Sequence, residues 1–275
     1  GAPFMPVVSV RDIDVYYERA GHGPRLLYIG GTGGDLRVRP NVLDGPLVRH
    51  FDVVAYDQRG LGQTSKPQGP YTMADYAEDA AALLDALGWG QALVLGVSFG
   101  GMVAQELILR FPEKVRALAL ACTGAGGAGG ASFPLHELSG LPEAERLARH
   151  LAVSDLRRDA RWRTANPEHW ARLLQTARER QSEARFQPGA RWQLEARAGH
   201  DTWDRLAGIR TPVLLAGGRY DGIAPPANMQ AIARRIPKAE LQLFDGGHLF
   251  LIQDKQAYLF IIQWLEAQAQ KVEPM

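Results

Sequence analysis

Short continuous runs of apolar residues alternate with longer segments of helical periodicity in the first half of the chain. Such runs, without polar alternation, are typical of strands that are covered on both faces of a sheet. The expected strands are residues 7–10, 13–18, 25–29, 51–56, 92–95 and 115–121, the first two forming a hairpin. Helices placed between strands require crossover connections, so the pattern predicts an α/β protein with a mainly parallel sheet.

Two helices are expected between these strands. Residues 72–87 begin with Thr-Met-Ala-Asp, which is a capping box with Asp in the place of Glu, and the apolar spacing ends near Gly88. Residues 102–110 form the second helix, which is expected to end before Pro112.

The middle of the chain interrupts this alternation. Residues 123–206 show no strand pattern, and 141–153, 167–180 and 191–198 read as helices rich in Arg and Glu. Strands (213–216, 241–244) and helices (226–235, 255–269) then alternate again. We therefore expect a core formed by residues 1–122 and 207–275. A helical cap, residues 123–206, is inserted after the sixth strand, and its size favours a functional role.

Composition excludes several classes of protein. Apolar residues make up 46% of the 275 residues, charged residues 22%, and the formal net charge is +1, so we expect neither nucleic acid nor a membrane as partner. Cys122 is the single cysteine, and no basic region followed by an apolar run opens the chain, so a cytoplasmic protein is expected. No cluster of His, Cys or carboxylate residues predicts a metal, and no cofactor is expected. Residues 124–129 match a dinucleotide-binding glycine pattern, but no helix follows, so a cap hinge is the better interpretation. The oligomeric state is not predicted.

The strongest chemical signal is Gly96-Val97-Ser98-Phe99-Gly100, a G-x-S-x-G pattern between a predicted strand and a predicted helix. A sharp turn at this place holds a serine hydroxyl in open space, and glycines leave room where side chains would collide. Ser98 is therefore the candidate nucleophile. The backbone N–H of Phe99, at the start of the helix, is a candidate oxyanion donor.

A serine hydroxyl needs a base within hydrogen-bond reach. His248 follows the strand expected at residues 241–244, and Asp221 follows the strand expected at residues 213–216, so both lie at the carboxyl edge of the sheet. Asp221 can orient the imidazole and stabilise its charged form. The order Ser98, Asp221, His248 is that expected of an α/β-hydrolase triad. Asp245 is the rival acid, but it lies close to His248 in the sequence.

The second oxyanion donor is expected in the glycine-rich segment that follows an early strand, residues 30–34. Gly31 is the preferred donor and Thr32 the alternative. Phe133, Trp162 and Leu249 are candidates for lining a substrate pocket, although packing inside the cap is an alternative role for such aromatic residues.

The sequence resembles the α/β-hydrolase superfamily over almost its whole length. Besides the serine turn, residues 57–62 are similar to the family's D-x-R-G-x-G turn, and residues 221–225 to its acid loop, in which Pro follows Asp. Within the superfamily the chain is most similar to the 3-oxoadipate enol-lactonase and carboxylesterase group, on residues 193–206. Ile29 departs from the family's usual His before the oxyanion loop.

This resemblance implies an α/β-hydrolase fold and a serine hydrolase that cleaves a small ester or lactone through an acyl-enzyme on Ser98. Two alternatives stay open at this point. The same triad could serve acyl transfer, C–C bond hydrolysis, perhydrolysis or lyase chemistry, because fold does not determine function. The chain could also be a non-catalytic ligand-binding protein on a hydrolase scaffold.

Overall fold

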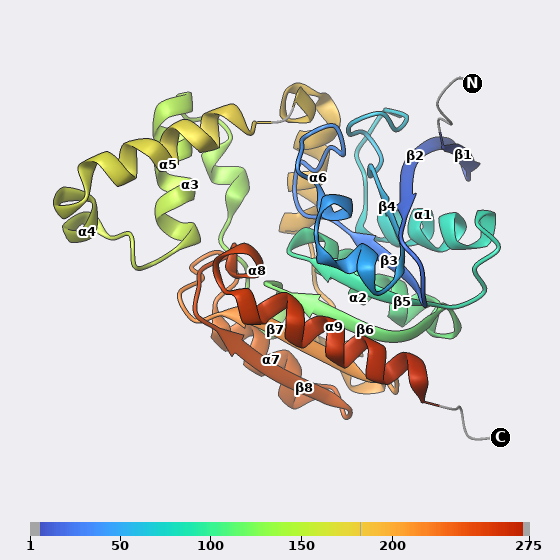
Figure 1. Ribbon diagram of the computed structural model, residues 1–275. Coiled ribbons are helices and arrows are strands. Elements are labelled where there is room, and N and C mark those ends of the chain that lie inside the picture. Colours follow the sequence, from blue (N-terminus) through green and yellow to red (C-terminus); the bar gives the residue numbers. More distant parts are fainter. Residues whose placement is uncertain (1–5, 182, 272–275) are drawn as a thin grey trace.

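A twisted sheet organises the molecule. The computed structural model describes residues 6–181 and 183–271, and in these residues eight strands pair in the order β1-β2-β4-β3-β5-β6-β7-β8 (Figure 1). The strands are β1 (Val7–Val10), β2 (Ile13–Ala20), β3 (Arg25–Ile29), β4 (Asp52–Tyr56), β5 (Ala92–Val97), β6 (Val115–Ala121), β7 (Val213–Gly218) and β8 (Ala239–Phe244). The pairs β1–β2 and β2–β4 are antiparallel and the others parallel, which confirms the expected mainly parallel sheet.

Helices cover both faces of this sheet. Two successive residues of β3 show why the strands of this sheet have continuous apolar sequences. Leu27 packs into the core on one face of the sheet, and Leu26 packs into the core on the other face. The first core is closed by α1 (Met73–Ala86), α2 (Phe99–Arg110) and α7 (Pro226–Arg235), and the second by α8 (Phe250–Gln253) and α9 (Lys255–Gln270). A strand buried on both faces cannot alternate apolar with polar residues.

The capping box at the start of α1 is confirmed. The hydroxyl of Thr72 accepts a hydrogen bond from the backbone N–H of Asp75 at 3.2 Å, and the Asp75 carboxylate accepts one from the N–H of Thr72 at 2.9 Å. The start expected for α2 was wrong by three residues, because the helix begins at Phe99 and not at Met102. Gly100 and Gly101 weaken the helical pattern, yet both lie inside the first turn.

Residues between β6 and β7 form α3 (Glu143–Ser154), α4 (Ala160–Ala165), α5 (Pro167–Glu179) and α6 (Pro188–Ala198). Figure 1 shows α3, α4 and α5 standing to one side of the sheet, with α4 farthest from it. Short 3-10 helices occupy Val42–Asp44, Pro46–Arg49, Pro112–Lys114, Gly127–Gly129, Leu135–Leu138, Glu183–Phe186 and Trp203–Gly208. Within the described ranges, no helix has the length and apolar character that a membrane crossing requires.

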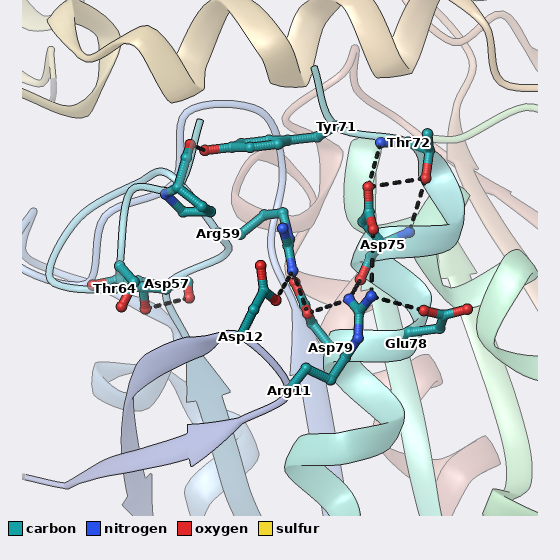
Figure 2. Close-up of polar contacts among 12 residues, drawn as sticks. Arg11, Asp12, Asp57, Arg59, Thr64, Tyr71, Thr72, Asp75, Glu78 and Asp79 are labelled. Carbon is teal, nitrogen blue, oxygen red and sulfur yellow. Dashed lines mark hydrogen bonds and ion pairs between the residues drawn. The ribbon is translucent and has the colours of Figure 1, made fainter. Parts of the chain in front are cut away.

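A buried ionic network holds the D-x-R-G-x-G turn. Figure 2 shows Arg59 between Asp79 of α1 and Asp12 of the β1–β2 turn. Arg59 contacts both carboxylate oxygens of Asp79, at 2.7 and 2.9 Å, and Arg11 also contacts Asp79 at 2.8 Å. The side chains of Arg59 and Asp79 are 5% and 3% exposed, so this pair is shielded from solvent screening.

The Asp79→Asn substitution is expected to destabilise the protein by about 3 kcal/mol or more, because it leaves the buried Arg59 guanidinium without its main carboxylate. The measurement is the free energy of unfolding from urea titration. Arg149→Gln is the control, since it removes an ion pair to Glu145 whose two side chains are 60% and 45% exposed. Such exposed pairs contribute about 0–1 kcal/mol. Equal effects of the two substitutions would contradict a structural role for the network.

Candidate active site

Ser98 lies in the sharp turn between β5 and α2. Its φ is 56°, in the left-handed region that non-glycine residues rarely adopt, at a typical cost of about 1–3 kcal/mol. Two hydrogen bonds hold this conformation: the Ser98 N–H donates to the Ala121 carbonyl at 2.8 Å, and the Thr123 hydroxyl donates to the Ser98 carbonyl at 2.9 Å. The last residue of the neighbouring strand β6 and Thr123, which follows that strand, therefore hold Ser98 in its strained backbone conformation.

Two glycines of the turn are required by close packing. A Cβ atom on Gly100 would lie 1.9 Å from the carbonyl oxygen of Ile29, and one on Gly96 would lie 2.5 Å from the carbonyl oxygen of Gly100. Contacts under 3 Å are not tolerated between such atoms, so the turn brings the start of α2 against the end of β3 only with glycine at these positions.

The structure brings Ser98, His248 and Asp221 together as expected from the sequence. Ser98 Oγ lies 2.9 Å from His248 Nε2, and His248 Nδ1 lies 2.8 Å from Asp221 Oδ2. Both distances are normal for hydrogen bonds. The imidazole therefore connects the hydroxyl to the carboxylate in one continuous chain.

Asp221 is fully buried, and its second carboxylate oxygen is also satisfied. Oδ1 accepts hydrogen bonds from the backbone N–H groups of Ile223 and Ala224, at 2.8 and 2.9 Å. The acid loop thus holds the carboxylate in one orientation, with Oδ2 directed to the imidazole. The rival Asp245 is 75% exposed and pairs with Arg219 at 3.2 Å.

The end of α3 contacts the loop of His248 and the loop of Asp221, a feature that the sequence pattern did not predict. The His248 N–H donates to the Ser154 carbonyl at 2.6 Å, and the Gly222 N–H donates to the Val153 carbonyl at 3.0 Å. The Leu156 N–H donates in turn to the Tyr220 carbonyl at 2.8 Å. The inserted segment therefore helps to position the loop of His248 and the loop of Asp221.

The glycine-rich segment after β3 lies beside the serine. A Cβ atom on Gly31 would be 3.6 Å from Ser98 Cβ, so the backbone of this residue lies beside the nucleophile candidate. Thr32 is exposed. Phe99 is the first residue of α2, so its backbone N–H has no acceptor inside the helix. Gly31 and Phe99 thus both lie beside Ser98, as candidate backbone donors require.

Two glutamine side chains hold this segment, one from each side. Gln58, in the D-x-R-G-x-G turn, donates from Nε2 to the Gly30 carbonyl at 2.9 Å. Gln193, in α6, accepts at Oε1 from the Gly33 N–H at 2.8 Å and is fully buried. Ile29, in the place of the family's usual histidine, is also fully buried at the end of β3. The segment is therefore tied to the core by Gln58 and to the inserted helices by Gln193.

The three expected pocket residues lie in different surroundings. Leu249 follows His248 directly and is 48% exposed, whereas Phe133 packs in a small apolar cluster with Ile223 of the acid loop. Trp162 lies in α4, and its ring contacts the rings of His169 and Trp170 in α5. The structure does not bring Trp162 to the triad, because α4 packs on α5 at the outer end of the inserted segment (Figure 1).

Cys122 is fully buried at the end of β6, as expected of a core residue. Burial, and then the nearby Asp221 carboxylate, raises the pKa of its thiol, so it stays protonated. Among the described residues, no group of three or more His, Cys, Asp or Glu side chains could hold a metal ion.

Comparison with known proteins finds relatives over most of the chain. The family described as alpha/beta hydrolase fold matches residues 24–255. The chain is 32% identical to a poly(3-hydroxyalkanoate) depolymerase of Ectopseudomonas oleovorans, over 91% of this chain and 87% of the relative. It is 26% identical to 3-oxoadipate enol-lactonase 2 of Acinetobacter baylyi, over 93% and 94%.

Among solved structures, the enol-lactonase of Burkholderia xenovorans LB400 superimposes with a TM-score of 0.73 at 24% identity, covering 97% of this chain and 100% of that one. At this identity the likeness concerns the fold. The match to the family spans most of the chain and includes the serine turn, the acid loop and the histidine loop. The protein therefore belongs to the α/β-hydrolase family.

Proposed function

We propose that the protein hydrolyses a small carboxylic ester or lactone through an acyl-enzyme on Ser98. One observation carries the proposal: the continuous contact of Ser98 Oγ, the His248 imidazole and the buried Asp221 carboxylate, at 2.9 and 2.8 Å. Nucleophile, base and orienting acid in mutual hydrogen-bond contact are the arrangement that activates a serine hydroxyl.

In the first half of the reaction, His248 Nε2 takes the proton of Ser98 while Oγ attacks the substrate carbonyl carbon. The carbonyl oxygen becomes an oxyanion, which the N–H groups of Phe99 and Gly31 stabilise. The proton on His248 then passes to the leaving alcohol oxygen as the C–O bond breaks, and the acyl group remains on Ser98. Asp221 stabilises the transient imidazolium and holds its tautomer.

In the second half, His248 takes a proton from water, and the hydroxide attacks the acyl carbon. Collapse of the second oxyanion releases the carboxylic acid and returns the proton to Ser98 Oγ. For a lactone, the alcohol and the acid belong to one product molecule. No step requires a metal or cofactor, because the imidazole carries each proton.

Residues 123–206 act in this proposal as a cap on the core formed by residues 1–122 and 207–275. Gln193 reaches the oxyanion segment, and Ser154 and Val153 reach the catalytic loops. Leu249 and Phe133 remain the proposed pocket residues, the first because it adjoins His248 and the second because it packs on the acid loop.

The proposed nucleophile is tested by labelling with a fluorophosphonate, followed by peptide mapping. The proposal expects one label per chain, on Ser98, and no label after prior denaturation. Absence of labelling on folded protein would favour a ligand-binding role. Hydrolysis is then separated from acyl transfer and C–C cleavage by a substrate panel in which every product is identified. Products other than an acid and an alcohol would overturn ester hydrolysis.

Gln193→Met is expected to lower kcat about tenfold with a smaller change in KM. The substitution keeps the side-chain volume but removes the acceptor of the Gly33 N–H, so the oxyanion segment loses its tie to α6. Loss of a complete oxyanion donor lowers kcat by about 10²–10³-fold, and displacement of the segment should lower kcat by a smaller factor. Glu195→Ala, at a 54% exposed position of the same helix, is the control and should leave kcat unchanged. An effect on KM alone would contradict the positioning role.

A further inference from the structure

Arg197 of α6 is a buried cation that the proposed reaction does not use. Only 6% of the residue is exposed, and its Nη1 donates to the Phe133 carbonyl at 2.8 Å. Among the described side chains, its buried Nε has no hydrogen-bond partner, no acceptor contacts its Nη2, and no carboxylate pairs with it. Burial lowers the pKa of Arg197 to about 10, so the side chain remains charged at neutral pH. A buried charge without a counter-charge destabilises the folded protein, and a function that needs this charge would account for it.

The two groups without acceptors form one edge of the guanidinium. In this same chain, the edge made by Nε and Nη2 binds a carboxylate through two parallel hydrogen bonds. The examples are Arg19 with Asp52 (2.9 and 2.7 Å), Arg59 with Asp79 (2.7 and 2.9 Å) and Arg157 with Asp155 (3.0 and 2.8 Å). This planar fork matches the geometry of a carboxylate. Arg197 therefore presents a carboxylate-binding edge for which the described part of the chain supplies no carboxylate.

Arg197 also lines a cavity of about 160 Å³. Other residues of its wall are Met102 of α2, Ser132 and His136 from the segment before α3, and His200 just after α6. No Asp or Glu is among the described residues that line it. The volume corresponds to that of about five water molecules in the liquid, which suits a small organic acid.

The wall of the cavity includes a residue of the helix that follows Ser98. Met102 lies one helical turn after Ser98 in α2, and its N–H donates to the Ser98 carbonyl at 3.3 Å. On the other side, Arg197 lies one turn after Gln193, the residue that holds the oxyanion segment. The cavity is thus bounded by α2, which follows Ser98, and by α6, which contacts the glycine-rich segment after β3.

We propose that Arg197 and this cavity form a subsite that binds the carboxylate of a small aliphatic acid. Two sources would present the same chemistry: the acid end of a substrate that reacts at Ser98, and a free organic acid. The first rests on the proposed function and names its substrate class, an ester or lactone with a free carboxylate. The second is independent of that function.

Binding is tested by calorimetric titration of the full chain with sodium butanoate at constant ionic strength, with butanamide as the neutral probe. The proposal expects saturable binding of butanoate at one site and at least about tenfold weaker binding of butanamide. Arg197→Met should weaken butanoate binding at least about tenfold, as loss of a charge-assisted hydrogen bond does. Arg191→Met is the matched control, because this residue of the same helix is 70% exposed and pairs with Glu195.

Thermal unfolding shows whether Arg197→Met loses butanoate binding only because the variant is misfolded. Replacing an unpaired buried charge by an apolar side chain of similar length should leave the melting temperature equal or higher without ligand. Failure of the wild-type chain to bind butanoate saturably would overturn the proposal, as would equal affinity in Arg197→Met.

Hydrolysis of monomethyl succinate and of methyl butanoate, followed by pH-stat, distinguishes the two sources. If the subsite holds the acid end of the substrate, wild type prefers monomethyl succinate, and Arg197→Met loses that preference at least about tenfold, mainly through KM. If the preference between the two esters does not depend on Arg197 but the affinity for butanoate does, the subsite binds a free acid. If neither ester is hydrolysed and the substrate panel also fails, the proposed function fails while the titration result stands.

Discussion

Ser98→Ala is expected to lower kcat for p-nitrophenyl acetate by about 10⁶-fold, the size of effect known when a triad nucleophile is removed. The alanine chain keeps the oxyanion donors and the binding surface, so a small residual rate above that in water should remain. The substitution also removes no packing, because Ser98 contributes only its hydroxyl to the contact with His248. The measurements are kcat and the melting temperature of both chains.

Ser139→Ala provides the control for this experiment. Ser139 is exposed, and its hydroxyl donates only to the His136 carbonyl at 2.8 Å, so the control should keep wild-type activity. Activity of Ser98→Ala within tenfold of wild type would remove Ser98 from the mechanism, whatever the geometry of the turn.

Asp221→Asn is expected to lower kcat by about 10⁴-fold while the protein stays folded. Asparagine has the same shape, and its carbonyl oxygen can still accept from the N–H groups of Ile223 and Ala224. Its NH2 group then faces His248 Nδ1 and can only donate a hydrogen bond. The imidazole therefore adopts the tautomer whose Nε2 carries the proton. That tautomer cannot take the proton of Ser98.

Asp245→Asn distinguishes the two candidate acids, because both aspartates follow strands at the same edge of the sheet. Asp245 is exposed and pairs with Arg219, so its substitution should leave kcat within about twofold of wild type. A loss in Asp245→Asn as large as that in Asp221→Asn would show that the acid was wrongly assigned.

The central strands β3 to β7 were predictable because they are short, mostly apolar and bounded by turn residues. Leu26 and Leu27 face opposite cores, so β3 reads as an apolar run after Arg25, and β5 and the part of β6 after Arg116 do the same. The serine, acid and histidine could also be found from the sequence, because each lies in the turn or loop that follows a strand. Their approach to hydrogen-bond distance follows from the shared carboxyl edge of a parallel sheet.

Several features could not be predicted because they depend on distant parts of the chain. Gln193 and Gly33 are 160 residues apart, and nothing local to either indicates their hydrogen bond. The contact of Ser154 with the His248 loop depends in the same way on how α3 docks. Trp162 is an aromatic residue of the kind that lines apolar pockets. Only the packing of α4 on α5 shows that it lies away from the triad.

The inserted segment contacts the parts of the core that the proposed mechanism uses. Gln193 holds the oxyanion segment, and the end of α3 holds the loops of Asp221 and His248. Displacement of the inserted helices would therefore disturb nucleophile activation and oxyanion stabilisation together. Variants of Gln193 that change kcat more than KM would report this coupling.

The most direct test of the central claim is stopped-flow hydrolysis of p-nitrophenyl acetate, with mass spectrometry of protein quenched during the first turnover. We expect a burst of p-nitrophenol of about one equivalent per chain and an acetyl group on Ser98, neither of which Ser98→Ala should show. A folded wild-type chain that gives no burst, no turnover and no adduct on Ser98 would contradict the acyl-enzyme mechanism.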